Sequence, residues 1–212
     1  MNTRAWRTYL VTDDAHSAGR ETPAVVEAAL EGGVDVVQLR EKPMDARTRY
    51  RVGRTVRSLT AEAGVPLVVN DRVDLAAAID ADGVHLGQTD LPVEVARDQL
   101  GSDAIVGVSA ATVAEARAAA DAGADYLGVG AVYGTNSKDV ADDRDGVGPE
   151  RIRSITEAVD VPVVGIGGIT AENAAPVVEA GANGVAVISA ITAADDPEAA
   201  TAALREVVER AR

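Results

Sequence analysis

Short runs of aliphatic residues recur along the chain, and five of them follow a helical stretch and a break at glycine, as in 180–187. Valine-rich runs without polar alternation are typical of strands buried on both faces of a parallel sheet. Glycine at the break suits the left-handed end of a helix. We predict eight strands, near residues 8–12, 34–39, 66–69, 83–86, 105–108, 125–129, 162–166 and 184–188.

Helix signals occupy the segments between these runs. Residues 45–63 place apolar side chains at three- and four-residue spacing, behind an aspartate in the capping position. Thr112 and Glu115 form a capping box at the start of another helix. Pro176 lies inside a later helical pattern, so that helix either starts late or kinks. Residues 197–212 predict a final amphipathic helix.

Strand–helix alternation without a shift in composition predicts a single domain over residues 1–212. Eight such units predict a (β/α)8 TIM barrel, with its active site at the C-terminal ends of the strands. The chain is shorter than the roughly 250 residues typical of this fold, so helices and loops should be short. The alternative is an open doubly wound sheet, but residues 10–14 lack the glycine fingerprint that would favour it.

The charge of the chain narrows the classes of partner. It has 34 acidic and 20 basic residues, and the net charge of −14 disfavours binding to nucleic acids. Eighteen of the basic residues are arginine, and only Lys42 and Lys138 are lysine. With no Phe and an excess of acidic residues, this composition predicts adaptation to a salt-rich cytosol and a halophilic source. The alternative is GC-rich coding bias with an ordinary acidic surface.

The composition also bears on location. Cysteine is absent, which removes disulfides, thiolate nucleophiles and Cys-ligated metals. The longest uncharged stretch, 180–194, includes polar residues and falls short of the roughly 20 apolar residues of a membrane span. Residues 1–14 lack the apolar core of a signal peptide. We expect a cytoplasmic protein with small-molecule substrates and no membrane partner, and a homo-oligomer is left open.

Unusual polar residues follow the predicted strands, at the end where such barrels carry their chemistry. These residues are Gln38, Arg40, Glu41 and Lys42 after the second strand, Asn70 and Asp71 after the third, Asp90 after the fourth, Ser109 after the fifth, Lys138 after the sixth, and Ser189 after the eighth. Both lysines of the chain therefore fall on one rim.

Two carboxylates on neighbouring strand ends, Asp71 and Asp90, suit Mg²⁺, which takes few protein oxygens and leaves room for a substrate phosphate. Each is alternatively a helix N-cap. Arg40 and Lys42 beside such a pair suit a clamp for a diphosphate, and are otherwise ordinary surface charges.

Glycines at 167–168 after the seventh strand, with Ser189 after the eighth, are typical of the phosphate site of these barrels, although the glycines alone would also suit a tight turn. Asn70 and Ser109 either contact substrate or satisfy backbone groups. The histidines, at 16 and 85, are expected to be packed or incidental. The rim as a whole suggests a transferase that joins a diphosphate-activated group to a phosphorylated acceptor.

Five segments resemble the thiamine-phosphate synthase family, in the same order and over nearly the whole chain. They are 9–13 (YLVTD), 38–42 (QLREK), 69–72 (VNDR), 83–90 (GVHLGQTD) and 165–169 (GIGGI). The resemblance implies a (β/α)8 barrel that condenses 4-amino-2-methyl-5-hydroxymethylpyrimidine diphosphate with a thiazole phosphate, giving thiamine phosphate and diphosphate. Whether the thiazole is carboxylated is left open.

The resemblance also assigns site residues. It places Gln38, Leu39, Arg40, Glu41, Lys42, Asn70, Ser109 and Lys138 at the pyrimidine diphosphate, with Lys138, Arg40 and Lys42 in catalytic roles. Asp71 and Asp90 would hold Mg²⁺, and Thr135, Asn136, Ser137, Gly168, Ile188 and Ser189 would hold the thiazole phosphate. The chain departs from the family pattern at Gly134 and Ser137, where proline and threonine are usual.

Two rivals remain at this stage. A thiazole tautomerase-like isomerase shares the barrel and the thiazole phosphate site, but it needs neither a diphosphate clamp nor a metal pair. A non-catalytic barrel that binds phosphorylated metabolites would explain the glycines but not the paired aspartates.

Overall fold

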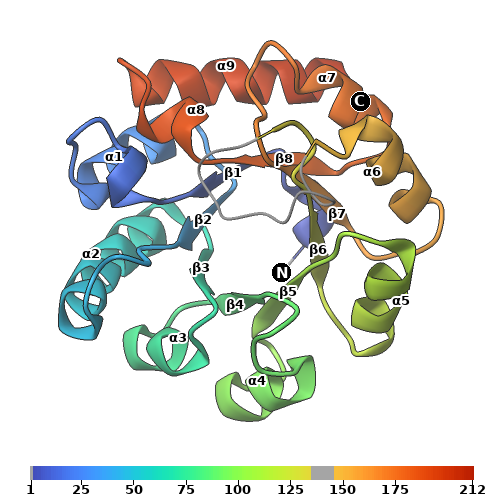
Figure 1. Cartoon of the computed structure of the whole chain (residues 1–212). Helices are drawn as coiled ribbons and strands as arrows, with labels where there is room; N and C mark the ends of the chain where they lie inside the picture. Colours follow the sequence, from blue (N-terminus) through green and yellow to red (C-terminus); the bar gives the residue numbers. More distant parts are fainter. Residues whose placement is uncertain (1, 135–145) are drawn as a thin grey trace.

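The strands close into a barrel. In the computed structural model, which describes residues 2–134 and 146–212, the eight strands run parallel and pair in sequence order, with β8 completing the ring against β1 (Figure 1). They are β1 (Thr8–Val11), β2 (Val36–Leu39), β3 (Leu67–Asn70), β4 (Gly83–Leu86), β5 (Ile105–Ser109), β6 (Tyr126–Val129), β7 (Val163–Ile166) and β8 (Gly184–Val187). The predicted (β/α)8 barrel is confirmed, and the open sheet is excluded.

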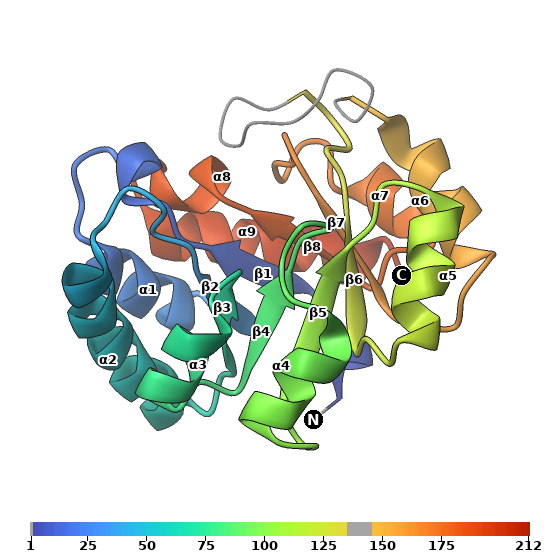
Figure 2. The same ribbon diagram turned by 60° about the horizontal axis from the view of Figure 1, so that its bottom comes forward.

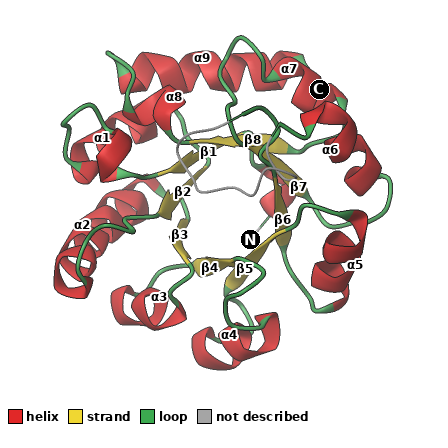
Figure 3. Cartoon of the chain, in the orientation of Figure 1, coloured by secondary structure: helices red, strands yellow, loops and turns green. Residues whose placement is uncertain are grey.

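The helices surround this ring (Figure 3), and the strand arrows point towards one end of it (Figure 2). The α-helices are α1 (Thr22–Glu31), α2 (Ala46–Ala63), α3 (Val73–Ile79), α4 (Val93–Leu100), α5 (Val113–Asp121), α6 (Gly148–Thr156), α7 (Ala175–Glu179), α8 (Ser189–Thr192) and α9 (Pro197–Arg210), and the 3-10 helices are η1 (Thr3–Ala5) and η2 (Asp14–His16). Within the described ranges, no helix combines the length and apolar character that a membrane span requires.

The helix ends follow the predicted signals, with small differences. Asp45 caps α2 by accepting the N–H groups of the next turn. Thr112 caps α5 through the N–H of Glu115, but the Glu115 carboxylate reaches back to the N–H of Ala111 rather than that of Thr112. The helix around Pro176 starts late instead of kinking, because proline takes the first turn of α7, where its missing N–H is harmless.

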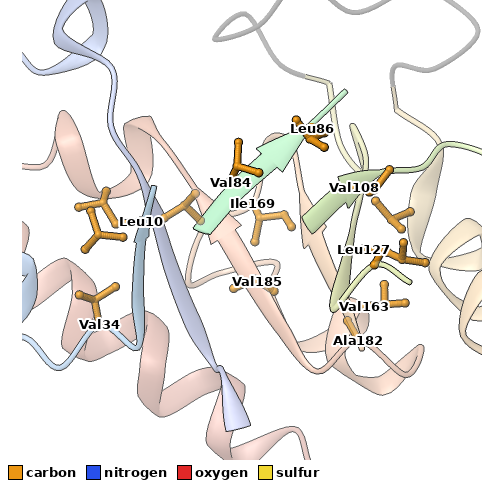
Figure 4. Close-up of a cluster of buried hydrophobic side chains, with 14 of the residues drawn as sticks. Leu10, Val34, Val84, Leu86, Val108, Leu127, Val163, Ile169, Ala182 and Val185 are labelled. Carbon is orange, nitrogen blue, oxygen red and sulfur yellow. The ribbon is translucent and has the colours of Figure 1, made fainter. Parts of the chain in front are cut away.

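Two apolar layers account for the burial of the strands on both faces. Outward-facing residues such as Leu10 and Val84 pack with the helices (Figure 4), whereas inward-facing residues such as Tyr9 and Val68 fill the barrel. Strand side chains alternate between these layers. In β2, for example, Leu39 faces the helices and Gln38 faces the interior. The alternation decides which residues at the strand ends point into the barrel mouth.

A repeated clasp joins the amino end of each odd-numbered strand to the loop before the next strand. In each clasp, the loop residue donates its backbone N–H to the strand and accepts the same strand residue's N–H with its side-chain oxygen. The clasp residues are Asp35, Asp82, Asp125 and Asn183. The three carboxylates also pair with Arg205, Arg57 and Arg97, at N–O distances of 3.0, 2.8 and 2.8 Å.

Candidate active site

A buried ion pair lies where β1 and β2 end. The Arg40 guanidinium donates to Asp13 at 2.5 Å, and both side chains are less than a tenth exposed. Arg40 also donates its backbone N–H to the Thr12 hydroxyl at 3.0 Å. Such a pair holds the guanidinium in one place, because moving it would leave a buried carboxylate without its counter-charge. Arg40 is therefore not an ordinary surface charge.

Asp71 and Asp90 lie together at the ends of β3 and β4, close enough for a hydrogen bond between their carboxyl groups. Lys42 approaches Asp71 with an N–O distance of 3.1 Å. Burial raises the pKa of Asp90, and the neighbouring Asp71 raises it further, whereas the Gly87 N–H and the Lys42 charge oppose this shift. One ammonium thus faces two carboxylates that repel each other.

The backbone shows that neither aspartate is a helix N-cap. The N-cap of α3 is Arg72 and that of α4 is Pro92. Asp71 adopts a left-handed conformation with φ of 63°, a strained state for a residue with a side chain, although aspartate tolerates it better than most. Its N–H donates to the His85 carbonyl at 2.8 Å, which ties this turn to β4. We refer to Asp13, Arg40, Lys42, Asp71 and Asp90 as the charged sector.

A cavity of about 410 Å³ opens beside this sector, with Asp71 and Asp90 in its wall. Thr89 and Gln99 add polar groups to its lining. Polar ligands therefore have room next to the paired carboxylates.

Two neighbours of Arg40 turn their side chains away from the mouth. Leu39 packs in the layer between strands and helices. The Glu41 side chain is buried, and its oxygens accept from the Asp14 N–H at 2.9 Å and the Thr22 hydroxyl at 2.7 Å. Substrate contact from Leu39 or Glu41 would therefore be made by backbone atoms.

A chain of hydrogen bonds crosses the barrel interior beneath the mouth. Gln38 donates to the Tyr9 hydroxyl at 2.7 Å, and the hydroxyls of Tyr9 and Tyr126 lie 2.7 Å apart. His85 contacts Tyr126 with Nδ1 and Ser109 with Nε2, both at 2.9 Å. We call these five residues the interior chain. His85 is buried, as the prediction of a packed histidine requires. The prediction did not include its contact with Ser109, a candidate substrate contact.

The opposite side of the mouth is built from backbone. Gly167 and Gly168 have φ of 105° and 62°, and a Cβ on Gly168 would lie 2.6 Å from the Gly134 carbonyl oxygen. Asn173 stabilises this turn by donating to the Gly168 carbonyl at 3.0 Å. On the neighbouring strand, Ile188 and Ser189 follow β8 and begin α8. We call Gly167, Gly168, Ile188 and Ser189 the glycine sector.

Four of the predicted site residues lie outside the described residues, so their roles stay predictions. They are Thr135, Asn136, Ser137 and Lys138. Among the described candidates, Gln38, Arg40 and Lys42 come from β2 and its loop, and Asn70 ends β3 in register with His85. The histidine at position 16 lies 3.3 Å from Asp13, next to the charged sector.

Comparisons with known proteins identify the family. The family model for thiamine monophosphate synthase matches residues 8–191. The chain belongs to this family. Thiamine-phosphate synthase from Natronomonas pharaonis is 66% identical over 98% of this chain and 97% of its own length, and that from Haloarcula marismortui is 62% identical over 98% and 99%. A solved thiamine phosphate pyrophosphorylase from Pyrococcus furiosus covers 99% of both chains, with 42% identity and a TM-score of 0.89.

Within this family, the chain is an enzyme, a transferase of thiamine biosynthesis. The resemblance drawn from the five sequence segments is thus confirmed. The solved relative extends the agreement to the barrel itself.

Sequence reasoning missed three residues that shape the site. Asp13 follows the first strand, so the rule applied to the other strand ends would have found it. Tyr126 had a weaker and indirect signal. A glycine inside a strand indicates that another group packs closely against it, and here that glycine is Gly107, on which a Cβ would lie 2.1 Å from the Tyr126 ring. Asn173 has no signal in the sequence, because only the folded turn brings it to Gly168.

Proposed function

We propose that the chain transfers the aminopyrimidinylmethyl group of 4-amino-2-methyl-5-hydroxymethylpyrimidine diphosphate to the ring nitrogen of a thiazole phosphate. The charged sector takes the diphosphate and the glycine sector takes the thiazole phosphate. The observation that carries this assignment is the cluster of Lys42, Asp71 and Asp90, where two adjacent carboxylates share one ammonium.

The paired carboxylates fit Mg²⁺. Their mutual repulsion is what a divalent cation would relieve, and burial adds to the need for counter-charge. No cluster of three or more acidic, His or Cys side chains suited to a metal occurs in the described part of the chain. A site with two carboxylates and open positions is typical of Mg²⁺ that shares its coordination with substrate phosphate. When bound by Asp71 and Asp90, the ion supplies positive charge to the departing diphosphate.

The chain's own residues supply the rest of the electrostatics. The bond from the pyrimidine methylene carbon to the diphosphate oxygen breaks first, the substrate amino group stabilises the resulting cation, and the thiazole nitrogen then bonds to that carbon. Arg40, held by Asp13, and Lys42 meet the charge that grows on the diphosphate. The attacking nitrogen has no proton to lose, so the step needs no strong general base.

The glycine sector positions the acceptor. Without side chains at 167–168, the phosphate reaches backbone N–H groups, and Ser189 adds a hydroxyl at the start of α8. Holding both substrates in line converts the reaction into an intramolecular one.

The two alternative functions, an isomerase and a binding protein, do not require all the charged residues at the barrel mouth. An isomerase acting on the thiazole alone has no use for the Asp13–Arg40 pair or for the carboxylates beside Lys42. A binding protein would take up the substrates without turnover.

The test mixes purified protein in molar KCl with both substrates, with and without Mg²⁺, and oxidises the thiamine phosphate formed to fluorescent thiochrome. Mg²⁺-dependent product supports both the reaction and the metal. Product that forms without added Mg²⁺ and after residual metal has been removed contradicts the metal assignment but not the reaction. A folded sample that binds substrate but yields no product supports a rival.

We further propose that the chain works in a salt-rich cytoplasm. The net charge of −14 and the preference for arginine over lysine support this setting, and the compared relatives include enzymes of halophilic archaea. The melting temperature should rise between low and molar KCl, because salt screens the repulsion of the acidic surface. A melting temperature that does not rise would contradict the proposal.

A further inference from the structure

The interior chain connects two candidate substrate contacts that lie on different strands of the barrel. It runs from Gln38 on β2 through Tyr9 on β1 and Tyr126 on β6 to His85 on β4 and Ser109 on β5. Four consecutive contacts of 2.7 to 2.9 Å leave no gap.

The chemistry of the members sets the direction of the protons. The Gln38 amide donates to the Tyr9 oxygen, so the single Tyr9 proton is directed to Tyr126. When each hydroxyl gives its one proton to the next member, the Tyr126 proton lies on the bond to Nδ1 of His85, and the His85 proton on Nε2 points to the Ser109 oxygen. Burial raises the pKa of both tyrosines, which keeps their protons in place.

The two ends of the chain are left with defined polarity. The Gln38 Oε1 atom is buried and accepts no hydrogen bond in the part of the chain that the structure describes. In this arrangement of protons Ser109 accepts from His85, so its own proton is available to a ligand. Among the described residues, the chain therefore ends in an unpaired buried acceptor on β2 and a donor on β5.

Two glycines make room for the rings of the chain. A Cβ on Gly107 would lie 2.1 Å from the Tyr126 ring, and one on Gly128 would lie 2.9 Å from the His85 ring. Both glycines lie inside strands, where glycine is otherwise unfavourable. The rings are thus accommodated by the barrel itself.

We propose that Tyr9, Tyr126 and His85 are positioning residues that hold Gln38 as an acceptor and Ser109 as a donor, and so select a pyrimidine with an amino group over one with an oxo group. This proposal rests on the proposed function, which places the pyrimidine at Gln38 and Ser109. The reversed chain, with the Gln38 amide turned over, would favour the oxo group instead.

The first experiment reads the tautomer of His85 without substrate. The chain has two histidines, so ¹⁵N-histidine labelling gives two ring systems, and His16→Gln assigns them. We expect His85 to be a single Nε2-protonated tautomer in the wild type and an averaged mixture in Tyr126→Phe. Trp6→Phe is the matched control, since Trp6 packs against both tyrosine rings without joining the chain. Protonation of Nδ1 in the wild type would overturn the proposal.

The second experiment measures selectivity. The ratio of kcat/KM for the 4-amino substrate to that for its 4-oxo analogue should fall about tenfold in Tyr126→Phe, the cost of roughly one hydrogen bond, and Trp6→Phe should keep it. Tyr9→Phe is a second variant should Tyr126→Phe not fold. A folded variant that retains the wild-type ratio would refute the positioning role. Failure of the proposed function looks different: the wild type forms no thiamine phosphate, while the tautomer of His85 is unaffected.

Discussion

The two ends of the barrel use charged residues in opposite ways. At the amino ends of the strands, the carboxylates of Asp35, Asp82 and Asp125 each accept a strand N–H and pair with an arginine. At the carboxyl ends, Asp71 and Asp90 lie next to each other, and one lysine, Lys42, pairs with Asp71.

The difference separates stability from function. A carboxylate whose partners are all supplied by the fold lowers the energy of the native state and has nothing left for a ligand. Two carboxylates that repel each other, as Asp71 and Asp90 do, raise the energy of the native state unless a bound cation or substrate offsets the repulsion. The Asp13–Arg40 pair has features of both ends, because it is buried and satisfied but holds a cation at the mouth.

The largest effect is expected for Asp13→Asn. Removing one charge of a buried pair leaves the Arg40 guanidinium uncompensated, which costs about 3 kcal/mol of unfolding free energy. Chemical denaturation measures this loss. Activity should fall as well, because Arg40 is no longer held in place. Adding Arg40→Met to Asp13→Asn removes the remaining buried charge, so the double variant should recover stability but not activity. Full activity in Asp13→Asn would show that the Asp13–Arg40 pair, like the amino-end carboxylates, serves stability and not function.

Asp71→Asn should lower kcat by about 100-fold, as loss of one electrostatic contact to the transition state typically does. Asparagine keeps the shape and tolerates the left-handed backbone, so stability should be unchanged or higher. Activity measured across a MgCl₂ titration should also show a higher Mg²⁺ requirement. Asp121→Asn, which changes an exposed carboxylate in the last turn of α5, is the control. An unaltered titration would place the metal elsewhere.

The sequence predicted the barrel well because its signals are local. Each strand is a short run of mostly apolar residues, several of them after a glycine, and the ends of each predicted strand lie within two residues of the observed ones. Most of the charged sector was also accessible, since Arg40, Lys42, Asp71 and Asp90 lie within four residues of the ends of predicted strands.

Contacts between distant segments were not accessible. The interior chain depends on strands closing into a ring, which brings Tyr9 to Tyr126 across the barrel. The clasps were hidden as well, because the aspartates before the strands resemble ordinary loop residues until the arginines of α2, α4 and α9 reach them. The direction of side chains within QLREK, by contrast, follows from the alternation along a strand, and grouping Glu41 with Arg40 overlooked it, because the Glu41 side chain faces the other way.

A smaller effect, on stability alone, is expected at the amino end. Asp82→Ala removes the acceptor of the Leu67 N–H and the partner of Arg57, and should cost about 2 kcal/mol of unfolding free energy. The specific activity of the folded fraction should be unchanged, because Asp82 lies at the end of the barrel away from the mouth. Denaturation curves and active-fraction assays measure the two quantities separately. A fall in kcat with intact stability would contradict the division between the ends.

The smallest effect should come from Asn183→Ala, which tests what the arginines add. Asn183 forms the same clasp, with its oxygen accepting the Val163 N–H at 3.0 Å, but as a neutral amide it needs no counter-charge. Its loss should cost about 1 kcal/mol, the value of an ordinary hydrogen bond. The difference from Asp82→Ala then measures the cost of leaving Arg57 unpaired. Repeating both in molar KCl sharpens the comparison, because salt screens the ion pair but not the neutral clasp, so the difference should shrink. Equal losses for the two variants at low salt would mean that the arginines contribute nothing and that the clasp alone stabilises the amino end.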